Sequence, residues 1–480
     1  MTNNWRPKPA DVIFRPRRIK RFRLRRVLGV AAVFSAGYGN VGSSIYYALG
    51  IVALAAMGAT PIALGAAGIL FIFTALTYAE GTASIPEAGG SASFARHGFN
   101  DLAGFSAGWA LMLSYIVTIA ISAFTIPPYL GYFWEPFKTS PFIGTTASIG
   151  IVLFLMAINV IGIKETSFIN VSAAVLDIAT QVSLVVIGFI LLFSPSVLWQ
   201  RIIDNWPTTE NLILGIAMAS IAYTGIETMS QMAEETKQPE KKVPKALIMM
   251  IITVLVIFAG ISMVSLSAMP PSELASEWSR DPVAGIAAYL PLELLRLILK
   301  PLIAILAGTI LLIATNAGLI GISRLAFSLG SHQLVPPVLS RVHHRFKTPY
   351  LSIILFSLVA LLILIPGFFA PDVFENMGAL YAVGSLLAFM FAHASILSLR
   401  IKKPELPRPF KIGWNIRIKE RQLPISAILG LASTTTIWVI ILITQSYSRW
   451  VGLAWMVSGL IIYYIYRRSR HLPLNHTSTD

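Results

Sequence analysis

The sequence predicts an all-α polytopic membrane protein with about 12 transmembrane helices. Of its 480 residues, 55% are hydrophobic and 12% are charged, whereas soluble domains contain about 25% charged residues. Long apolar segments recur along the whole chain, each close to the roughly 20 residues that cross a bilayer. The first and the sixth of these segments are interrupted at mid-depth by small and polar residues, a pattern typical of secondary transporters.

The expected spans account for most of the chain. They cover residues 27–50, 61–83, 102–132, 144–163, 168–194, 210–232, 245–268, 300–324, 350–368, 373–399, 424–445 and 450–466. Lys and Arg collect in alternate loops, and the other loops contain only Lys138, Arg201, Arg280, Arg296, Lys300 and Arg449. Because cytoplasmic loops carry the excess of basic residues, we expect both termini in the cytoplasm and the protein in the cell membrane. The net charge of +15 follows the ends of the spans, which indicates a lipid bilayer rather than nucleic acid as partner.

The order of the spans predicts an inverted repeat. Span one enters the membrane from the cytoplasm and span six from outside, so the two five-helix halves run in opposite directions. The expected parts are a basic cytoplasmic tail (1–26), the first repeat with helices 1–5 (27–199), the second repeat with helices 6–10 (200–400), a cytoplasmic loop with helices 11 and 12 (401–466), and a cytoplasmic tail (467–480).

The interruption of span one extends from Gly37 to Ser44 and contains three glycines, two serines and an asparagine. Irregular backbone at membrane depth is tolerated only inside protein or beside a watery cavity. Two interpretations stay open: a substrate site at a discontinuous helix, or a small-residue packing seam between helices. The polar side chains of Asn40, Ser43 and Ser44 favour the site.

Broken helices expose the two kinds of backbone group that a zwitterion needs. Residues 42–44 would offer N–H groups to a carboxylate, and residues 221–224 in span six would offer carbonyls to an ammonium. No charged side chain is evident in the outer pocket, so we expect neutral amino acids as substrates. Thr118 belongs to a polar stripe that either lines the pocket or bonds across helices. The predicted substrate-binding residues are Gly39, Gly42, Ser43, Ser44, Ile221, Ala222, Tyr223, Thr224 and Thr118.

Asp177 is the residue of span five that is hardest to explain as structural. It lies roughly 14 Å from the cytoplasmic end, where a charge costs at least ~2.5 kcal/mol. It would bind a coupling cation, either a proton or sodium, or it would be a protonated residue hydrogen-bonded to Gln181 or Asn316. The predicted ion-coupling residues are Asp177, Tyr38, Val41, Thr315 and Asn316.

The remaining polar residues indicate structural or gating roles. Glu227 follows the break in span six and is expected to hold that half-helix or to take part in gating. Glu80 is expected to pair with a basic loop residue such as Arg96. Four histidines (332, 343, 344 and 393) show no metal spacing and are expected at the membrane interface. Without cysteine, metal-ligand spacing, nucleophile elbow or phosphate loop, we expect no enzyme activity, metal or cofactor.

These residues resemble the amino acid–polyamine–organocation (APC) transporters. Gly39-Asn-Val-Gly-Ser-Ser-Ile-Tyr46 is similar to their G-x-I-G-S-G-I-F motif, and Ala222-Tyr-Thr-Gly-Ile-Glu227 is similar to A-Y-x-G-F-E. Further motifs follow in order as far as Pro404-Glu-Leu-Pro-Arg-Pro-Phe410. The resemblance implies a LeuT-type fold of 5+5 inverted repeats with broken helices 1 and 6 plus two helices. It also implies amino acid transport by alternating access.

Three positions depart from the family pattern. Ser44 replaces the third glycine of the first motif, and His332-Gln333 replaces a common Asp-Gly pair. Asp177 lies about where proton-coupled relatives often carry a lysine, so coupling by a lysine is not expected here. Two alternatives to a cation-coupled permease remain, an uncoupled amino acid exchanger and an amino acid sensor on a transporter scaffold.

Overall fold

The computed structural model describes residues 26–476 apart from 163–166, 347, 371 and 419–420. The tail predicted at 1–26 therefore lies outside the described residues except for Arg26. Ten helices in the described part of the chain are long and uninterrupted or nearly so. They are α3 (Thr60–Ser84), α5 (Asp101–Leu130), α7 (Pro141–Ile161), α8 (Ser167–Leu191), α12 (Pro239–Ala268), α15 (Glu293–Ser331), α16 (Tyr350–Leu364, continued by η6, Ile365–Phe368), α17 (Val373–Lys402), α18 (Ile425–Thr444) and α19 (Ser446–Ser469).

Two further spans are interrupted, and they are the two that the sequence predicted. Span one consists of α1 (Val30–Val41), η1 (Gly42–Ser44) and α2 (Ile45–Ala56). Span six consists of α10 (Thr209–Ala219), η3 (Ser220–Tyr223) and α11 (Glu227–Gln231). The shorter elements are η2 (Met57–Ala59), α4 (Ser91–Gly98), α6 (Pro136–Thr139), α9 (Pro195–Asp204), η4 (Ala233–Glu235), α13 (Pro271–Ala275), α14 (Pro282–Ala288), η5 (Pro337–Ser340), β1 (Asn415–Ile418) and β2 (Arg421–Pro424).

The prediction of an all-α polytopic membrane protein is confirmed. In the described residues, 11 helical stretches are long and apolar enough to cross a membrane. The first of them, Val30–Ser84, runs for 55 residues and turns at Met57, whose φ is 46°. It therefore holds two spans, which gives the expected total. The division into two repeats stays a prediction, and its boundary at 199/200 falls within α9.

Local sequence explains where several helices begin and end. The Asn100 side chain accepts a hydrogen bond from the Ala103 N–H (2.9 Å) and caps α5, and Thr208 caps α10 through the Asn211 N–H (3.3 Å). The helix α7 ends at Gly162, whose φ of 80° is in the left-handed region that favours glycine. Five short helices that the sequence did not predict, α4, α6, α9, α13 and α14, lie in the connections.

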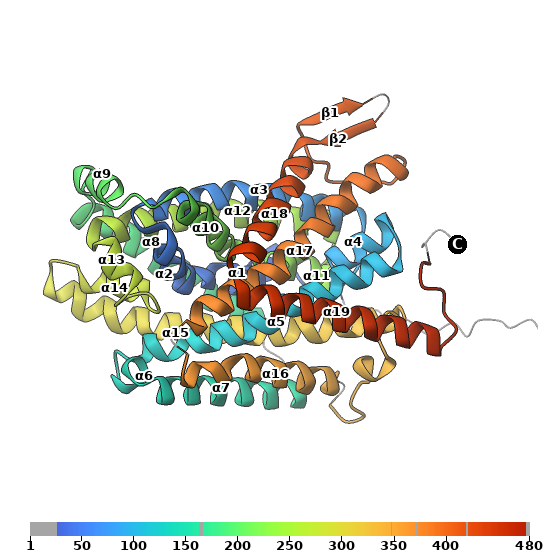
Figure 1. The fold of residues 1–480 in the computed structure, drawn as a ribbon, viewed down its shortest axis with the longest axis horizontal. Helices are drawn as coiled ribbons and strands as arrows, with labels where there is room; N and C mark the ends of the chain where they lie inside the picture. Colours follow the sequence, from blue (N-terminus) through green and yellow to red (C-terminus); the bar gives the residue numbers. More distant parts are fainter. Residues whose placement is uncertain (1–25, 163–166, 347, 371, 419–420, 477–480) are drawn as a thin grey trace, which may run out of the picture.

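The bundle is built around α5, whose apolar stretch is entirely buried. Most long helices run side by side along the horizontal direction of Figure 1. The short helices α6, α9, α13 and α14 lie at one end of the bundle, and α4, the β1–β2 hairpin and the last turns of α19 lie toward the other. The interrupted span one contacts α8, α12 and α15, so the predicted site lies inside the bundle.

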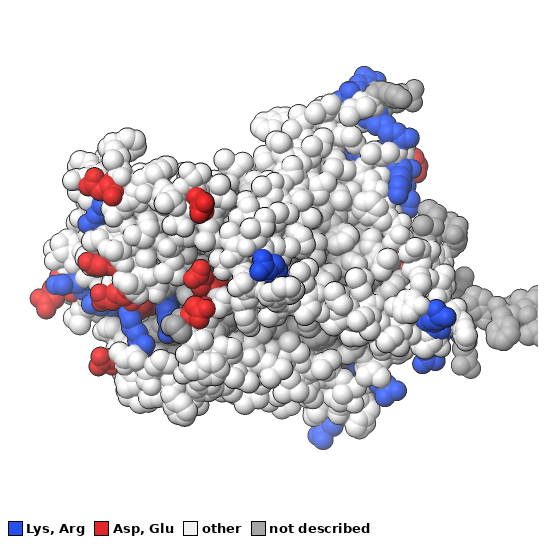
Figure 2. Space-filling model, in the orientation of Figure 1, with Lys and Arg blue, Asp and Glu red and all other residues white. Residues whose placement is uncertain are grey.

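Charge divides the two ends of the molecule. Figure 2 shows Asp and Glu gathered over the end with α9, α13 and α14, with some Lys and Arg among them, and mainly Lys and Arg around the opposite end. The distribution agrees with the asymmetry of the loops in the sequence. One histidine differs from expectation: His393 is buried rather than interfacial, because its ring lies between Thr77 (2.8 Å) and Thr74 (3.3 Å) of α3.

Candidate functional site

The interruption of span one is a tightened helical turn. Gly42, Ser44 and Ile45 keep right-handed helical angles, and the Gly42 N–H donates to the Tyr38 carbonyl. The Ser43 and Ser44 hydroxyls both donate to the Asn40 carbonyl, at 3.0 and 3.2 Å. Since one of the predicted anion-binding N–H groups is bonded within the helix, a substrate carboxylate would require this turn to open.

The interruption of span six is a true break. Thr224 is extended (φ −82°, ψ 158°), and Gly225 follows with φ 106°, which only glycine adopts without strain. The Ile221 carbonyl accepts from the Thr224 N–H (3.3 Å) and hydroxyl (2.8 Å), so it is already engaged.

Asn40 joins the two interruptions. Its side-chain amide donates to the Thr228 hydroxyl of α11 (3.1 Å), and a Cβ on Gly225 would lie 2.6 Å from the Asn40 side chain. The two interrupted helices thus pack directly against each other at their interruptions, as paired broken helices do around a transporter site.

The nine predicted substrate-binding residues are all buried. The Ser44 hydroxyl also bonds the Tyr47 hydroxyl (2.9 Å), and Thr118 donates to the Ser114 carbonyl (2.9 Å). Tyr223 reaches away from the break, because its hydroxyl donates to the Leu64 carbonyl (2.8 Å) and its ring packs on Phe71 and Phe258. The site is therefore closed to solvent in this conformation, and its role in binding stays a prediction.

Glu227 lies at the start of α11 and is completely buried. Its Oε2 accepts the Gly225 N–H (3.1 Å) and so holds the half-helix at the break. Among the described residues, Oε1 has no hydrogen-bond partner. The side chains of Tyr78, Tyr115 and Tyr381 lie nearby. The Glu227 carboxyl therefore keeps unused hydrogen-bonding capacity beside the break.

Asp177 connects both halves of span one. Tyr38 of α1 donates to Oδ2 (2.9 Å) and Tyr46 of α2 donates to Oδ1 (2.6 Å). Gln181, one turn further along α8, donates its amide to Oδ2 (2.6 Å). The Gln181 Oε1 is buried without a partner in the described part of the chain. Three donors therefore satisfy a buried carboxylate, and a proton or a hard cation would bind its oxygens only by displacing donors from them.

The other predicted ion-coupling residues have different partners. Thr315 donates to the Leu311 carbonyl within α15 (2.8 Å), and the Asn316 oxygen accepts from Asn159 of α7 (2.5 Å). Val41 is buried in the last turn of α1. Of the two proposed hydrogen-bond partners of Asp177, the structure brings Gln181 to the carboxylate.

Glu80 pairs with Arg400 and not with Arg96, which corrects the sequence prediction. Both Glu80 oxygens accept from Arg400 (Nε and Nη2, each 2.6 Å), and the Ile412 N–H adds a third bond (2.9 Å). Arg96 instead pairs with Glu87 (3.1 Å). The partners of Glu80 lie 320 or more residues away in the chain, so proximity in sequence misled the prediction.

Sequence reasoning missed Tyr46 and Tyr129. The Tyr129 hydroxyl donates to the Tyr46 carbonyl (2.8 Å) and accepts from the Val283 N–H (3.4 Å). Tyr46 was visible as an aromatic hydroxyl just beyond the interruption, but nothing in the sequence paired it with Asp177.

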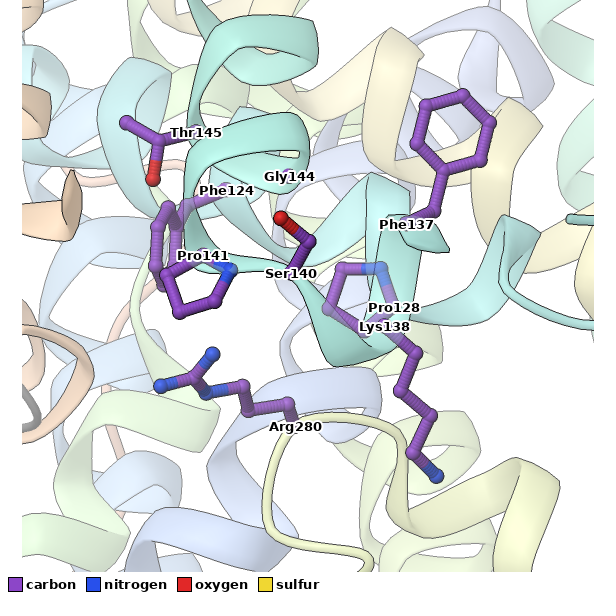
Figure 3. A pocket seen from close by; sticks show the side chains of 9 residues that line it. All are labelled: Phe124, Pro128, Phe137, Lys138, Ser140, Pro141, Gly144, Thr145 and Arg280. Atoms are coloured by element: carbon purple, nitrogen blue, oxygen red, sulfur yellow. The ribbon is translucent and has the colours of Figure 1, made fainter. Parts of the chain in front are cut away.

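A small pocket opens at the acidic end of the bundle (Figure 3). Arg280 extends there toward Phe124 and Pro141, and its guanidinium lies 5.6 Å from the Phe124 ring. With a volume of about 10 Å³ it has room for one water molecule, so it is not the amino acid site.

A bundle of membrane-length helices around two interrupted helices is the architecture of a secondary transporter. Residues 28–466 match the sequence model of the family described as "Amino acid permease". The chain belongs to this amino acid permease family, whose members are transporters and not enzymes.

Named relatives cover nearly the full chain. It is 27% identical to the branched-chain amino acid permease BcaP of Bacillus subtilis, over 94% of this chain and 95% of the relative. It is 26% identical to the methylthioribose transporter of the same organism (99% and 100% covered). It is 24% identical to the low-affinity putrescine importer PlaP of Escherichia coli K12 (92% and 93% covered).

Proposed function

We propose that this permease moves neutral amino acids across the cell membrane by alternating access, coupled to a proton or sodium ion at Asp177. One observation carries the coupling proposal. Tyr38 and Tyr46, on opposite sides of the interruption, donate to the two oxygens of the same carboxylate. A cation entering between these oxygens would replace the phenol hydrogens, so occupancy of Asp177 would change how the two half-helices are held.

Neutral substrates follow from the groups around the interruptions. The nine candidate residues carry no charged side chain. Glu227 is the charged neighbour, and one of its oxygens is committed to Gly225. The relative named for branched-chain amino acids supports this substrate class, and the putrescine importer argues for testing a diamine beside it.

The outer side of the site would be closed by the segment 271–288, which contains α13 and α14 and is called the outer lid here. The lid contacts α2, and Tyr129 links its Val283 to Tyr46. Lys138 also holds it through an ion pair with Asp281 (2.9 Å) and by lying 3.9 Å from the Trp278 ring centre. We assign this acidic end to the outside and the basic end, with both termini, to the cytoplasm.

Uptake into proteoliposomes tests the proposal. Labelled leucine and putrescine are offered under a sodium gradient, a proton gradient or neither. We expect gradient-driven leucine uptake in the wild type and its loss in Asp177→Asn, with Tyr46→Phe reduced. Asp204→Asn is the matched control, because Asp204 is an exposed residue at the end of α9.

An uncoupled exchanger is the second candidate, because three hydrogen bonds already satisfy Asp177 as a structural group. In that case Asp177→Asn would keep leucine exchange, and gradients would not drive uptake even in the wild type. A folded wild type that binds leucine but moves none would instead support a sensor.

A further inference from the structure

The β1–β2 hairpin between α17 and α18 is the one β-sheet in the described residues. It stands out from the upper edge of the bundle in Figure 1, beyond α17 and α18, at the end where Lys and Arg gather. It does not extend past the end of the bundle, where α19 ends. A hairpin beside helices that cross a bilayer lies over the neighbouring lipids at the level of the helix ends.

One face of the hairpin is largely apolar and uncovered, with Arg421 as its charged residue. Ile416 and Ile418 share a face of β1, and their cross-strand partners Leu423 and Arg421 lie on the same face. The exposed fractions of the two isoleucines are 44% and 52%, and Trp414 directly before the strand is 80% exposed. Tryptophan beside exposed isoleucine and arginine is typical of protein surfaces at the membrane interface.

The positive charge of the hairpin is not neutralised within the described residues. Arg417 and Arg421 are exposed and make no ion pair there, and Lys411 bonds only the neutral Gln422 side chain (2.7 Å). Charge of this kind next to an apolar face complements anionic headgroups. It also disfavours pairing with a second copy of the chain, since a two-fold contact would bring the same cations together.

Buried contacts fix the hairpin in this position. Arg400 is held by Glu80 and reaches the Gln422 carbonyl (3.4 Å), while Glu80 also accepts the Ile412 N–H just before Trp414. The Ile425 N–H closes the base of the hairpin on the Trp414 carbonyl (2.9 Å). The uncovered apolar face is therefore part of the folded structure.

We propose that the β1–β2 hairpin is an interfacial anchor that binds anionic lipid headgroups of the surrounding bilayer. Ile416, Ile418 and Trp414 enter the headgroup region, and Arg417 and Arg421 contact the lipid phosphates. The proposal rests on the multi-pass membrane placement of the chain and is independent of the transported substrate and of the coupling ion.

A single cysteine tests this directly, because the chain contains none. Ile416→Cys carries an environment-sensitive fluorophore in nanodiscs with one protein copy each, made of phosphatidylcholine alone or with phosphatidylglycerol. Spin-labelled lipids report contact. We expect blue-shifted emission and quenching that increase with phosphatidylglycerol and weaken with salt. The same probe at Ser469→Cys, at the exposed end of α19, is expected to stay water-like.

Charge-removal variants complete the test. Arg417→Gln and Arg421→Gln are each expected to raise the phosphatidylglycerol fraction needed for half-maximal quenching by roughly fivefold. Lys241→Gln, an exposed cation of α12, is the control and should change nothing. A water-like probe at position 416, equal quenching in both kinds of disc, or no effect of the two arginine variants would overturn the proposal. So would a signal that appears only with two copies per disc.

Discussion

Replacing Gly50 by alanine should prevent the outer lid from seating on α2. A Cβ at this position would lie 1.9 Å from the Ser279 carbonyl oxygen and 2.6 Å from its carbonyl carbon. Non-bonded heavy atoms pack at about 3.5 Å, so the lid must retreat by more than about 1 Å. The obstacle is lid backbone, which cannot turn aside as a flexible side chain does.

The cost falls on the closed state of the lid alone. Overpacking of this kind costs about 1–3 kcal/mol, and alanine is a better helix former than glycine, so α2 itself is not weakened. A penalty of this size shifts the ratio of closed to open lids by roughly 5- to 150-fold.

Labelling of a single cysteine measures the shift. Val283→Cys places a thiol on the buried side of the lid, where the native side chain is 1% exposed. We expect an impermeant thiol reagent to label it roughly 5 to 150 times faster in the Gly50→Ala background, with slower amino acid uptake. The control is Gly65→Ala in α3, where a Cβ meets no atom within 4 Å. Equal labelling and uptake in the Gly50 and Gly65 variants would refute the assignment of 271–288 as a lid.

Two further predictions concern stability. Glu80→Gln leaves Arg400 buried without its carboxylate and should lower the free energy of unfolding by about 3–5 kcal/mol. The double variant Glu80→Gln with Arg400→Met should lose less free energy of unfolding than the sum of the two single variants. If unfolding in detergent showed that the losses of the two single variants simply add in the double variant, the prediction would be wrong. The control is Arg96→Gln, which breaks a partly exposed ion pair and should lower the free energy of unfolding by less than about 1 kcal/mol. Burial raises the pKa of Asp281 from 3.8 to about 6 although the Lys138 charge opposes it. The native state therefore binds the proton more tightly than the unfolded state, so stability should fall as pH rises from about 4 to about 6 and level off above. Asp281→Asn should remove this change in stability between about pH 4 and about pH 6. If the variant loses as much free energy of unfolding between these two pH values as the wild type, the prediction is wrong.

The sequence could predict the features that depend on length and local composition. Apolar segments of membrane length identified the spans, and glycine and serine at mid-depth identified the stretch Gly37 to Ser44, which contains the interruption at η1 (Gly42–Ser44). The depth of Asp177 singled out one buried carboxyl. The sequence also grouped Tyr38 with Asp177, and the structure joins them by a hydrogen bond. It did not indicate Tyr46, which lies 131 residues away, because only the packing of α8 against span one brings Tyr46 to the carboxylate.

Departures from the family pattern became interpretable only with backbone angles. Gln333 has φ 58°, in the left-handed region that favours glycine, so the glycine of the family's Asp-Gly pair would adopt this angle without strain. Ser44 uses its hydroxyl within span one, on Asn40 and Tyr47. A single sequence does not reveal either, because neither the angle nor the rotamer is encoded in residue type alone.

The contacts of Tyr46 explain why the interruption of span one is a tight turn in this conformation. Its hydroxyl is bonded to Asp177 and its carbonyl to Tyr129, which also accepts from the lid residue Val283. If α2 rotated away from α1, the hydrogen bond from Tyr46 to Asp177 would break. The same rotation would strain the link from Tyr46 through Tyr129 to the lid. In the proposed cycle, a cation at Asp177 removes the first of these constraints. Loading of the cation and release of the outer lid are then linked through one tyrosine, and Tyr46→Phe should uncouple them.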